Sequence, residues 1–253
     1  MLKLKVKIFC FISLLFIILF AWIYGKEKSY SVTMEFFTEN GSHVEYPQIK
    51  NLKNKKKQKE INKILEEQIY LGAKDYLLET FVDFSNPRYV YDFKIKTGYI
   101  DQHIASFLYS FFAHGFDGPG DKYFQHNSRN YGVTIDMETG EKLELSKFMI
   151  IDERLIDSTD GSGKETNYDS PAYDYHTFKD LYYVYTSEKE KDNFHQYTMQ
   201  DIIEQLNSSI RETMWYIDKD KNIVFYRGDA SLRIPYTELE EIIYPSYLED
   251  LCK

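Results

Sequence analysis

The stretch Tyr131–Met149, YGVTIDMETGEKLELSKFM, decides the predicted fold. Apolar residues alternate with polar or small ones over Tyr131–Glu138, which is the period of a half-buried strand. Glu138-Thr139-Gly140 then supplies turn residues, since Gly140 tolerates the positive φ that closes a hairpin loop. After the turn, Leu143 and Leu145 alternate with charged residues. We therefore expect a second strand that folds back on the first, and with it an antiparallel sheet.

Further strands and helices surround this hairpin in a mixed order. Strands are expected at Ser31–Thr38, Val44–Ile49, Tyr89–Ile95, His103–Ala113, Trp215–Ile217, Ile223–Tyr226 and Ser231–Ile234, and helices from Asn54 to about Val82, after the capping box Thr198–Asp201 and after a second capping box at Thr237–Glu240. This order predicts an α+β fold rather than alternating βα units. We expect an antiparallel sheet packed with two or three helices, preceded by one N-terminal transmembrane, signal-anchor helix.

Two strands carry distinctive signals. His103–Ala113 (HIASFLYSFFA) is apolar or small on both faces, which is typical of a central strand. Val44–Ile49 contains Pro47, which cannot donate to a ladder, so this segment is expected at a sheet edge.

The amino-terminal segment is predicted to enter a membrane. Three lysines precede Ile8–Tyr24, a run without charge that is just long enough to span a bilayer. A signal peptide has the same pattern, but no A-x-A site follows, so an uncleaved anchor is favoured. The lysines place the amino end in the cytoplasm and the body outside. We expect a single-pass protein of the cell membrane, or a secreted one if the segment is cleaved.

The chain has no compositional linker that would separate independent domains. Residues 1–25 are predicted to form a cytoplasmic stub and the anchor. Residues 26–100 form a strand-helix-strand part and residues 101–253 an antiparallel α+β part, which together make one compact extracytoplasmic unit.

The composition and net charge of this unit limit the kinds of partner that it can bind. Hydrophobic residues make up 43% of the 253 residues and aromatic ones 17%, which suits a packed core. Residues 1–25 hold three lysines and no acid, so the rest carries 28 basic and 40 acidic residues, a net charge of −12. This charge excludes a strongly basic nucleic-acid interface and would attract a cationic partner.

Several motifs together resemble a known extracytoplasmic domain. They are Tyr46-Pro47-Gln48-Ile49 before a helix rich in Lys and Glu, the Asp-x-x-Thr-Gly-Glu-x-Leu-x-Leu-x-x-Phe run of the Thr134–Met149 hairpin, and Leu232–Leu239 (LRIPYTEL). Over about residues 31–245 the chain resembles a domain of unknown function. That domain is the extracytoplasmic part of RsiV-type lysozyme-sensing anti-sigma factors and the N-terminal part of PdaC-type peptidoglycan deacetylases.

Departures from this family limit what the resemblance implies. Met1–Lys7 is too short to hold a sigma factor, and the Asp-Asp pair of the deacetylase motif is missing. The resemblance therefore implies a binding module facing the cell envelope, without sigma regulation or deacetylation.

Catalytic and metal-binding motifs are weak. No Gly-x-Ser-x-Gly elbow and no phosphate-binding glycine loop occurs. No histidine pair has the i, i+4 spacing of a helical zinc site. His114 and His126, with Asp117 or Asp121, could approach a metal, but hydrogen-bonded loop histidines fit better, so no metal or cofactor is predicted.

The function expected from these observations is binding or sensing at the cell envelope, without catalysis. The partner would be a cationic protein such as lysozyme, or wall glycan, and the membrane would be contacted through Ile8–Tyr24. The ligand-binding residues predicted in a Tyr-rich insertion and a glycine loop are Tyr168, Tyr173, Tyr175, Phe178, Tyr182, His114, Phe116 and Asp117. The alternative is a wall-modifying hydrolase that uses carboxylates of the second half, such as Asp136 and Glu138.

Overall fold

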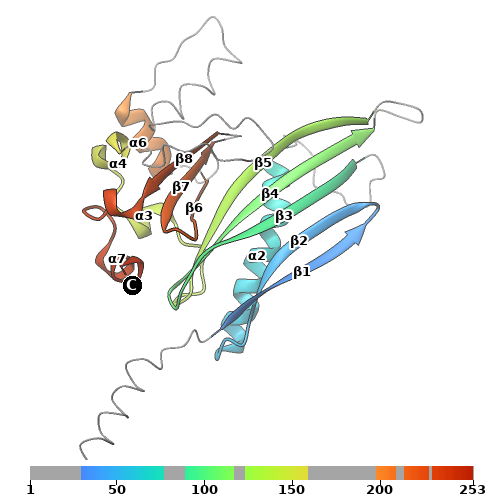
Figure 1. Ribbon diagram of the computed structural model, residues 1–253, viewed down its shortest axis with the longest axis horizontal. Helices are drawn as coiled ribbons and strands as arrows, with labels where there is room; N and C mark the ends of the chain where they lie inside the picture. Colours follow the sequence, from blue (N-terminus) through green and yellow to red (C-terminus); the bar gives the residue numbers. More distant parts are fainter. Residues whose placement is uncertain are drawn as a thin grey trace, which may run out of the picture.

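The computed structural model describes residues 30–76, 89–116, 123–158, 198–208, 214–227 and 230–252 (Figure 1). These residues form a five-stranded main sheet, a three-stranded small sheet and several helices, which confirms the α+β class. The main sheet comprises β1 (Ser31–Glu39), β2 (Ser42–Lys50), β3 (Tyr89–Ile100), β4 (Ile104–Phe116) and β5 (Tyr123–Asp136). The small sheet comprises β6 (Met214–Ile217), β7 (Asn222–Arg227) and β8 (Ala230–Pro235). The helices are α2 (Lys55–Tyr76), α3 (Leu145–Phe148), α4 (Glu153–Asp157), α6 (Met199–Ser208), the 3-10 turn η1 (Tyr236–Glu238) and α7 (Pro245–Leu251).

The main sheet is mixed, and the expectation of a purely antiparallel sheet is wrong. Its order is β1-β2-β3-β4-β5, and β2 and β3 run parallel at His43↔Asp92 and Val44↔Phe93. The other pairs are antiparallel. The long helix α2 lies between β2 and β3 in sequence and brings the chain back to the end of the sheet from which β2 started. β3 and β4 pair as one hairpin, so the main sheet contains strands from both predicted parts of the chain, residues 26–100 and residues 101–253.

The return strand predicted after Gly140 is not formed. β5 and the turn agree with the prediction, and Gly140 has φ +83°. The chain then makes only an isolated bridge, Ile135↔Lys142, before it enters the short helix α3. Leu143 and Leu145 are buried as expected. The misassignment arises because Leu145 and Phe148 also lie three residues apart, which suits one face of a helix.

The edge of the main sheet is β1, so the placement of Val44–Ile49 at an edge is wrong. The two-residue turn Asn40-Gly41 has positive φ at both positions, as a type I′ hairpin requires. The pair Glu39↔Ser42 beside such a turn is hydrogen-bonded, and the bonding alternates along the strands. The nitrogen of Pro47 therefore points away from β1, toward β3, where the parallel ladder has already ended at Val44.

Asn62 of α2 replaces the missing strand beside this part of β2. Its Oδ1 accepts the Ile49 N–H at 2.7 Å, and its Nδ2 donates to the Ile49 carbonyl at 3.0 Å. One side chain thus satisfies both backbone groups that β3 does not reach.

Helix boundaries follow the predicted caps in two of three cases. Asn54 Oδ1 accepts the Lys57 N–H at 3.1 Å at the start of α2. Thr198 and Asp201 form a reciprocal capping box before α6, with contacts of 2.7 and 3.2 Å. The box expected at Thr237–Glu240 is wrong: this segment holds η1, and α7 begins at Pro245, whose fixed φ suits the first helical position.

Helix α2 covers one face of the main sheet through Ile61, Leu65 and Ile69. The buried rings of Tyr109 and Tyr131 stack at 5.1 Å beneath it. Their hydroxyls donate to the α2 carbonyls of Leu65 and Gln68 at 3.0 and 2.9 Å, respectively. Burial raises the pKa of both tyrosines well above the usual range, so they stay neutral donors. The central position expected for the His103–Ala113 segment is confirmed, because β4 lies between β3 and β5.

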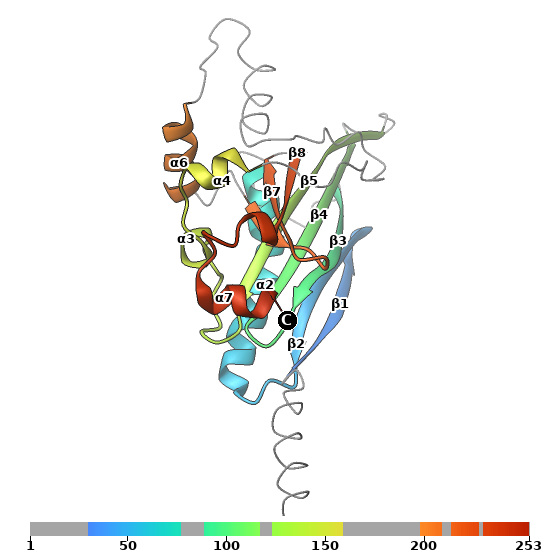
Figure 2. The same ribbon diagram turned by 60° about the vertical axis from the view of Figure 1, so that its left-hand side comes forward.

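The small sheet packs on the opposite face of β3, β4 and β5 (Figure 2). Gly98 and Gly132 allow close contact: a Cβ at these positions would lie 2.1 Å from the Ile217 carbonyl oxygen and 2.3 Å from that of Trp215. Between them, Ser106 Oγ accepts the Ile217 N–H at 2.8 Å and contacts Thr134 Oγ1 at 2.9 Å. The free side of β6 is thus held against the main sheet, backbone to backbone.

The predicted anchor Ile8–Tyr24 lies outside the described residues. Among the residues that are described, no helix is both long and apolar enough to cross a membrane.

Replacing Asn62 with Ala should lower the free energy of unfolding by about 1–3 kcal/mol, because two backbone groups of Ile49 lose their partner. Urea denaturation of the full chain in detergent micelles measures the change. Lys59→Ala, at an exposed position of the same helix, should shift stability by less than about 0.5 kcal/mol. Equal unfolding midpoints for the two variants would contradict the role given to Asn62.

Replacing Gly132 with Ala should cost about 1–3 kcal/mol, because the added methyl group meets backbone that cannot move without separating the sheets. The same denaturation experiment tests this change. The control is Ser146→Ala, at an exposed position of α3. A Gly132→Ala protein as stable as the parent would show that the two sheets are not in close contact at this position.

Candidate functional site

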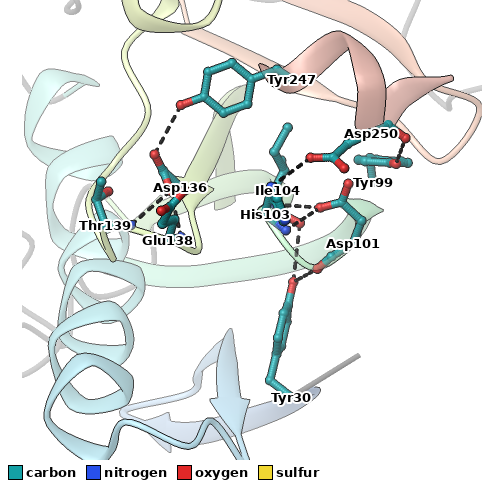
Figure 3. Close-up of polar contacts among 10 residues, drawn as sticks. All are labelled: Tyr30, Tyr99, Asp101, His103, Ile104, Asp136, Glu138, Thr139, Tyr247 and Asp250. Carbon is teal, nitrogen blue, oxygen red and sulfur yellow. Dashed lines mark hydrogen bonds and ion pairs between the residues drawn. The ribbon is translucent and has the colours of Figure 1, made fainter. Parts of the chain in front are cut away.

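Polar side chains gather where α7 meets the end of the main sheet (Figure 3). This polar cluster consists of Tyr30, Tyr99, Asp101, His103, Asp136, Tyr247 and Asp250. It joins the start of β1, the β3–β4 turn, the end of β5 and α7, which are up to 220 residues apart in sequence. Sequence reasoning singled out only Asp136 of this set.

The pair His103 and Asp250 brings an imidazole and a carboxylate together in the polar cluster. Nδ1 of His103 lies 3.0 Å from Oδ2 of Asp250. The Asp250 side chain is only 5% exposed, whereas that of His103 is 45% exposed. A buried carboxylate thus lies against an imidazole that is partly exposed to solvent. Such pairing is used in acid–base catalysis and also in purely structural contacts.

The rest of the β3–β4 turn has its polar groups engaged by the fold. Asp101 Oδ1 accepts the backbone N–H groups of His103 and Ile104 at 2.8 and 2.6 Å. Tyr30 donates to the Asp101 carbonyl at 2.5 Å, and Tyr99 donates to the Asp250 carbonyl at 2.8 Å. Burial, followed by the charge of Asp101, raises the pKa of both tyrosines far above the usual range. They act as neutral donors that fix β1 and α7 to the turn.

The two carboxylates of the hydrolase alternative have different surroundings. Asp136 Oδ1 accepts the N–H groups of Glu138 and Thr139 at 2.7 and 3.0 Å, and its Oδ2 accepts the Tyr247 hydroxyl at 3.1 Å. Asp136 therefore shapes the turn and holds α7. Glu138 is exposed beside the turn.

The described residues offer little for metal or hydroxyl chemistry. Within these ranges no group of three or more His, Cys, Asp or Glu residues is placed to hold a metal ion. The hydroxyls that contact the polar cluster belong to tyrosines and donate to backbone carbonyls or a carboxylate. If His103 acts as a base, water is therefore the simplest nucleophile that it could activate.

Only two of the predicted ligand-binding residues, His114 and Phe116, lie in the part of the chain that the structure describes. Tyr168, Tyr173, Tyr175, Phe178, Tyr182 and Asp117 lie outside the described residues. His114 and Phe116 belong to β4 rather than to the glycine loop: His114 pairs with Gln125, and Phe116 with Tyr123. Asp218–Asn222 form a β-turn, in which Asp218 Oδ1 accepts the N–H groups of Asp220 and Asn222.

A surface that sequence reasoning missed lies along β1. Met34 and Phe36 are 40% and 70% exposed, respectively, on the edge strand of the main sheet. These two residues lie two positions apart, as on one face of a strand, and a strand was predicted at Ser31–Thr38. Nothing local indicated that β1 would be the edge, because strand order depends on contacts distant in sequence.

Tyr247 makes alkaline stability sensitive to one contact. Partial burial, followed by the Asp136 carboxylate, raises the pKa of Tyr247 to about 12 from 10.0. Because the folded state holds this proton more tightly, the stabilisation is complete below pH 10 and is lost as the pH rises toward 12. Tyr247→Phe should therefore show a shallower loss of stability over this range than the parent. Urea titrations between pH 8 and 12 measure it, and Tyr244→Phe, at an exposed position, is the control. Identical slopes for the parent and Tyr247→Phe would contradict the assignment.

Comparisons with known proteins give a limited structural likeness. No family model matches the sequence, and no curated protein matches it significantly. A solved structure of a DUF3298 family protein from Pseudomonas aeruginosa PAO1 is similar over 85% of this chain and 93% of its own chain, with 12% sequence identity and a TM-score of 0.37. The structural neighbour is thus a member of a family named as a domain of unknown function. The link to lysozyme-sensing anti-sigma factors and deacetylases stays a prediction.

Proposed function

We propose that this chain is a membrane-anchored, extracytoplasmic binding domain of the cell envelope that captures a cationic protein of the lysozyme class without catalysis of its own. The observation that carries the proposal is the concentration of negative charge on the segments that pack beside the small sheet. The predicted anchor and the resemblance described above support the location.

This acidic layer is built from residues 136–158 and 230–252. They hold twelve acidic and four basic residues. The exposed acids are Glu138, Glu141, Glu153, Asp157, Glu238, Glu240, Glu241 and Glu249. The two segments lie side by side. The Ile150 N–H donates to the Ile242 carbonyl at 2.8 Å, and the Tyr244 N–H donates to the Phe148 carbonyl at 3.0 Å.

Little of this charge is neutralised within the layer. Arg154 and Arg233 are paired with Asp152 and Asp218, at 2.6 and 3.5 Å. Lys147 lies 3.4 Å from Glu144. None of these three pairs uses any of the eight exposed acids. At one end of the layer, Lys57 of α2 donates to the Glu138 carbonyl, so the negative field comes mainly from the other exposed acids. Such a field accelerates association with an oppositely charged protein.

The second candidate function is a wall-modifying hydrolase. His103 and Asp250 favour it, because a buried carboxylate lies against a half-exposed imidazole. The engaged hydroxyls of the polar cluster and the structural role of Asp136 favour binding instead. Release of sugar from purified peptidoglycan by the parent, abolished in His103→Gln, would establish the hydrolase.

Calorimetric titration of the full chain in detergent micelles with a cationic c-type lysozyme tests the proposal. We expect saturable binding that weakens as salt rises from about 0.05 to about 0.3 M, because the screening length shortens from about 14 to about 6 Å. Absence of heat, or binding that is independent of salt, would contradict capture through the acidic layer.

A matched pair of triple variants separates a specific surface from overall charge. Glu238→Gln, Glu240→Gln and Glu241→Gln together remove three charges from the acidic layer. Glu60→Gln, Glu66→Gln and Glu67→Gln remove the same charge from α2. The first set should weaken binding at least about tenfold more than the second, which corresponds to about 1.4 kcal/mol. Equal losses would mean that total charge, and not the acidic layer, attracts the lysozyme.

A further inference from the structure

The outer side of β1 offers backbone groups that its partner strand does not use. Glu39↔Ser42 flanks a two-residue turn and is hydrogen-bonded, so the bonded positions of β1 are Ser31, Thr33, Glu35, Phe37 and Glu39. The N–H and C=O groups of Val32, Met34, Phe36 and Thr38 therefore point away from β2. Within the described residues β1 ends the strand order, and no strand is paired to this side.

The two faces of β1 differ in chemistry along this edge. One face carries the four residues Val32, Met34, Phe36 and Thr38, of which Met34 and Phe36 are markedly exposed. The ring of Phe36 lies 5.9 Å from that of His43 on β2, and most of its surface is exposed. The other face carries Glu35 and Glu39 and no basic residue of β1 itself. Lys50 of β2 lies 3.0 Å from Glu35, so Glu39 is the acid of this face without an ion-pair partner among the described residues, and the face keeps a net negative charge.

These features specify an occupant. We infer that β1 docks an extended peptide segment of a second protein as a sixth strand, and that this segment alternates apolar and basic residues. Main-chain hydrogen bonds would provide the pairing, apolar side chains would cover Met34 and Phe36, and basic side chains would face Glu35 and Glu39. The edge is nine residues long, so a segment of similar length would fill it.

A second copy of this chain fits the edge less well. The antiparallel two-fold register that places Met34 against Phe36 of the other copy also places Glu35 opposite Glu35. Like charges directly opposite one another destabilise a strand pair. Two-fold registers centred on Met34 or Phe36 avoid this repulsion, but they place no basic residue opposite Glu35 or Glu39, because β1 has none. A basic segment from another protein avoids the repulsion and supplies that residue.

The inference goes beyond the proposed function. It assigns a second surface, on the side of the main sheet away from the small sheet and α3 to α7 (Figure 1). It concerns a linear segment rather than a folded cationic protein. If lysozyme does not bind, peptide docking on β1 is still possible. If the peptide does not dock on β1, the proposal for the acidic layer is not affected.

The probe is the capped peptide acetyl-KVKVKVKVK-amide, added to the full chain in detergent micelles. Amide hydrogen exchange is followed by NMR. Binding should slow exchange at Val32, Met34, Phe36 and Thr38 by at least about tenfold and leave Glu35 and Phe37 unchanged, since the latter two already bond to β2. The same peptide with Glu in place of Lys should bind at least about tenfold more weakly.

Two methylated peptides test the backbone pairing. One carries N-methyl groups on the valines and the other on the lysines. Antiparallel docking predicts loss of binding only for the first, because the valines would then pair with the outward residues of β1; parallel docking predicts loss only for the second. Binding that survives both methylations would overturn the inference.

A side-chain variant provides a further test. Phe36→Ser keeps the amide and removes the apolar contact, so affinity for the peptide should fall about tenfold. Tyr244→Ser, at another exposed aromatic position, should bind as the parent does. Unchanged affinity in Phe36→Ser would overturn the inference. Slow exchange of the four outward amides in the free chain would also overturn the inference, because the edge would already be occupied. Light scattering would then identify the occupant: a segment of the same chain if the protein is monomeric, or a second copy if it is dimeric.

Discussion

The arrangement of the carboxyl-terminal half depends on one constraint: two sheets meet backbone to backbone. The outer side of β6 faces the main sheet at Gly98 and Gly132, where there is no room for a Cβ, and Ser106 accepts the Ile217 N–H between them. This contact places α3, α4 and α7 beside the main sheet. The acidic layer and the polar cluster both follow from it, since each is built from elements that the small sheet carries or supports.

A second constraint organises the amino-terminal half. Because β2 and β3 are parallel, the chain must cross over the sheet, and α2 performs this crossing while it covers one face. The crossover leaves part of β2 without a neighbour, and Asn62 supplies both hydrogen bonds that Ile49 would otherwise lack. The hydroxyls of Tyr109 and Tyr131 then tie the helix to β4 and β5. The sheet and its helix are thus joined by directed polar contacts as well as by apolar packing.

Local periodicity was enough to predict most strands, because alternation records which face of a strand is buried. It failed after Gly140, where Leu143, Leu145 and Phe148 satisfy both the strand and the helix period. It also could not give strand order: Pro47 correctly indicated a position without a ladder bond, yet its strand β2 is not the last strand of the sheet. The pair His103 and Asp250 could not be predicted, since 147 residues separate them and neither stands in a motif. The exposed Met34 and Phe36 were missed for the same reason, as an edge is a property of the assembled sheet.

The orientation of β1 has a mechanical consequence. Ser31 and the turn at Asn40-Gly41 lie at opposite ends of the β1–β2 hairpin, and Tyr30 is fastened to the Asp101 carbonyl. A pulling force transmitted along the chain from residues before Tyr30 would first load this tyrosine contact. It would then act along the axis of β1, so that the bonds to β2 would be sheared together rather than opened one after another. A hairpin loaded in this direction resists extension more strongly than one that is opened from its end.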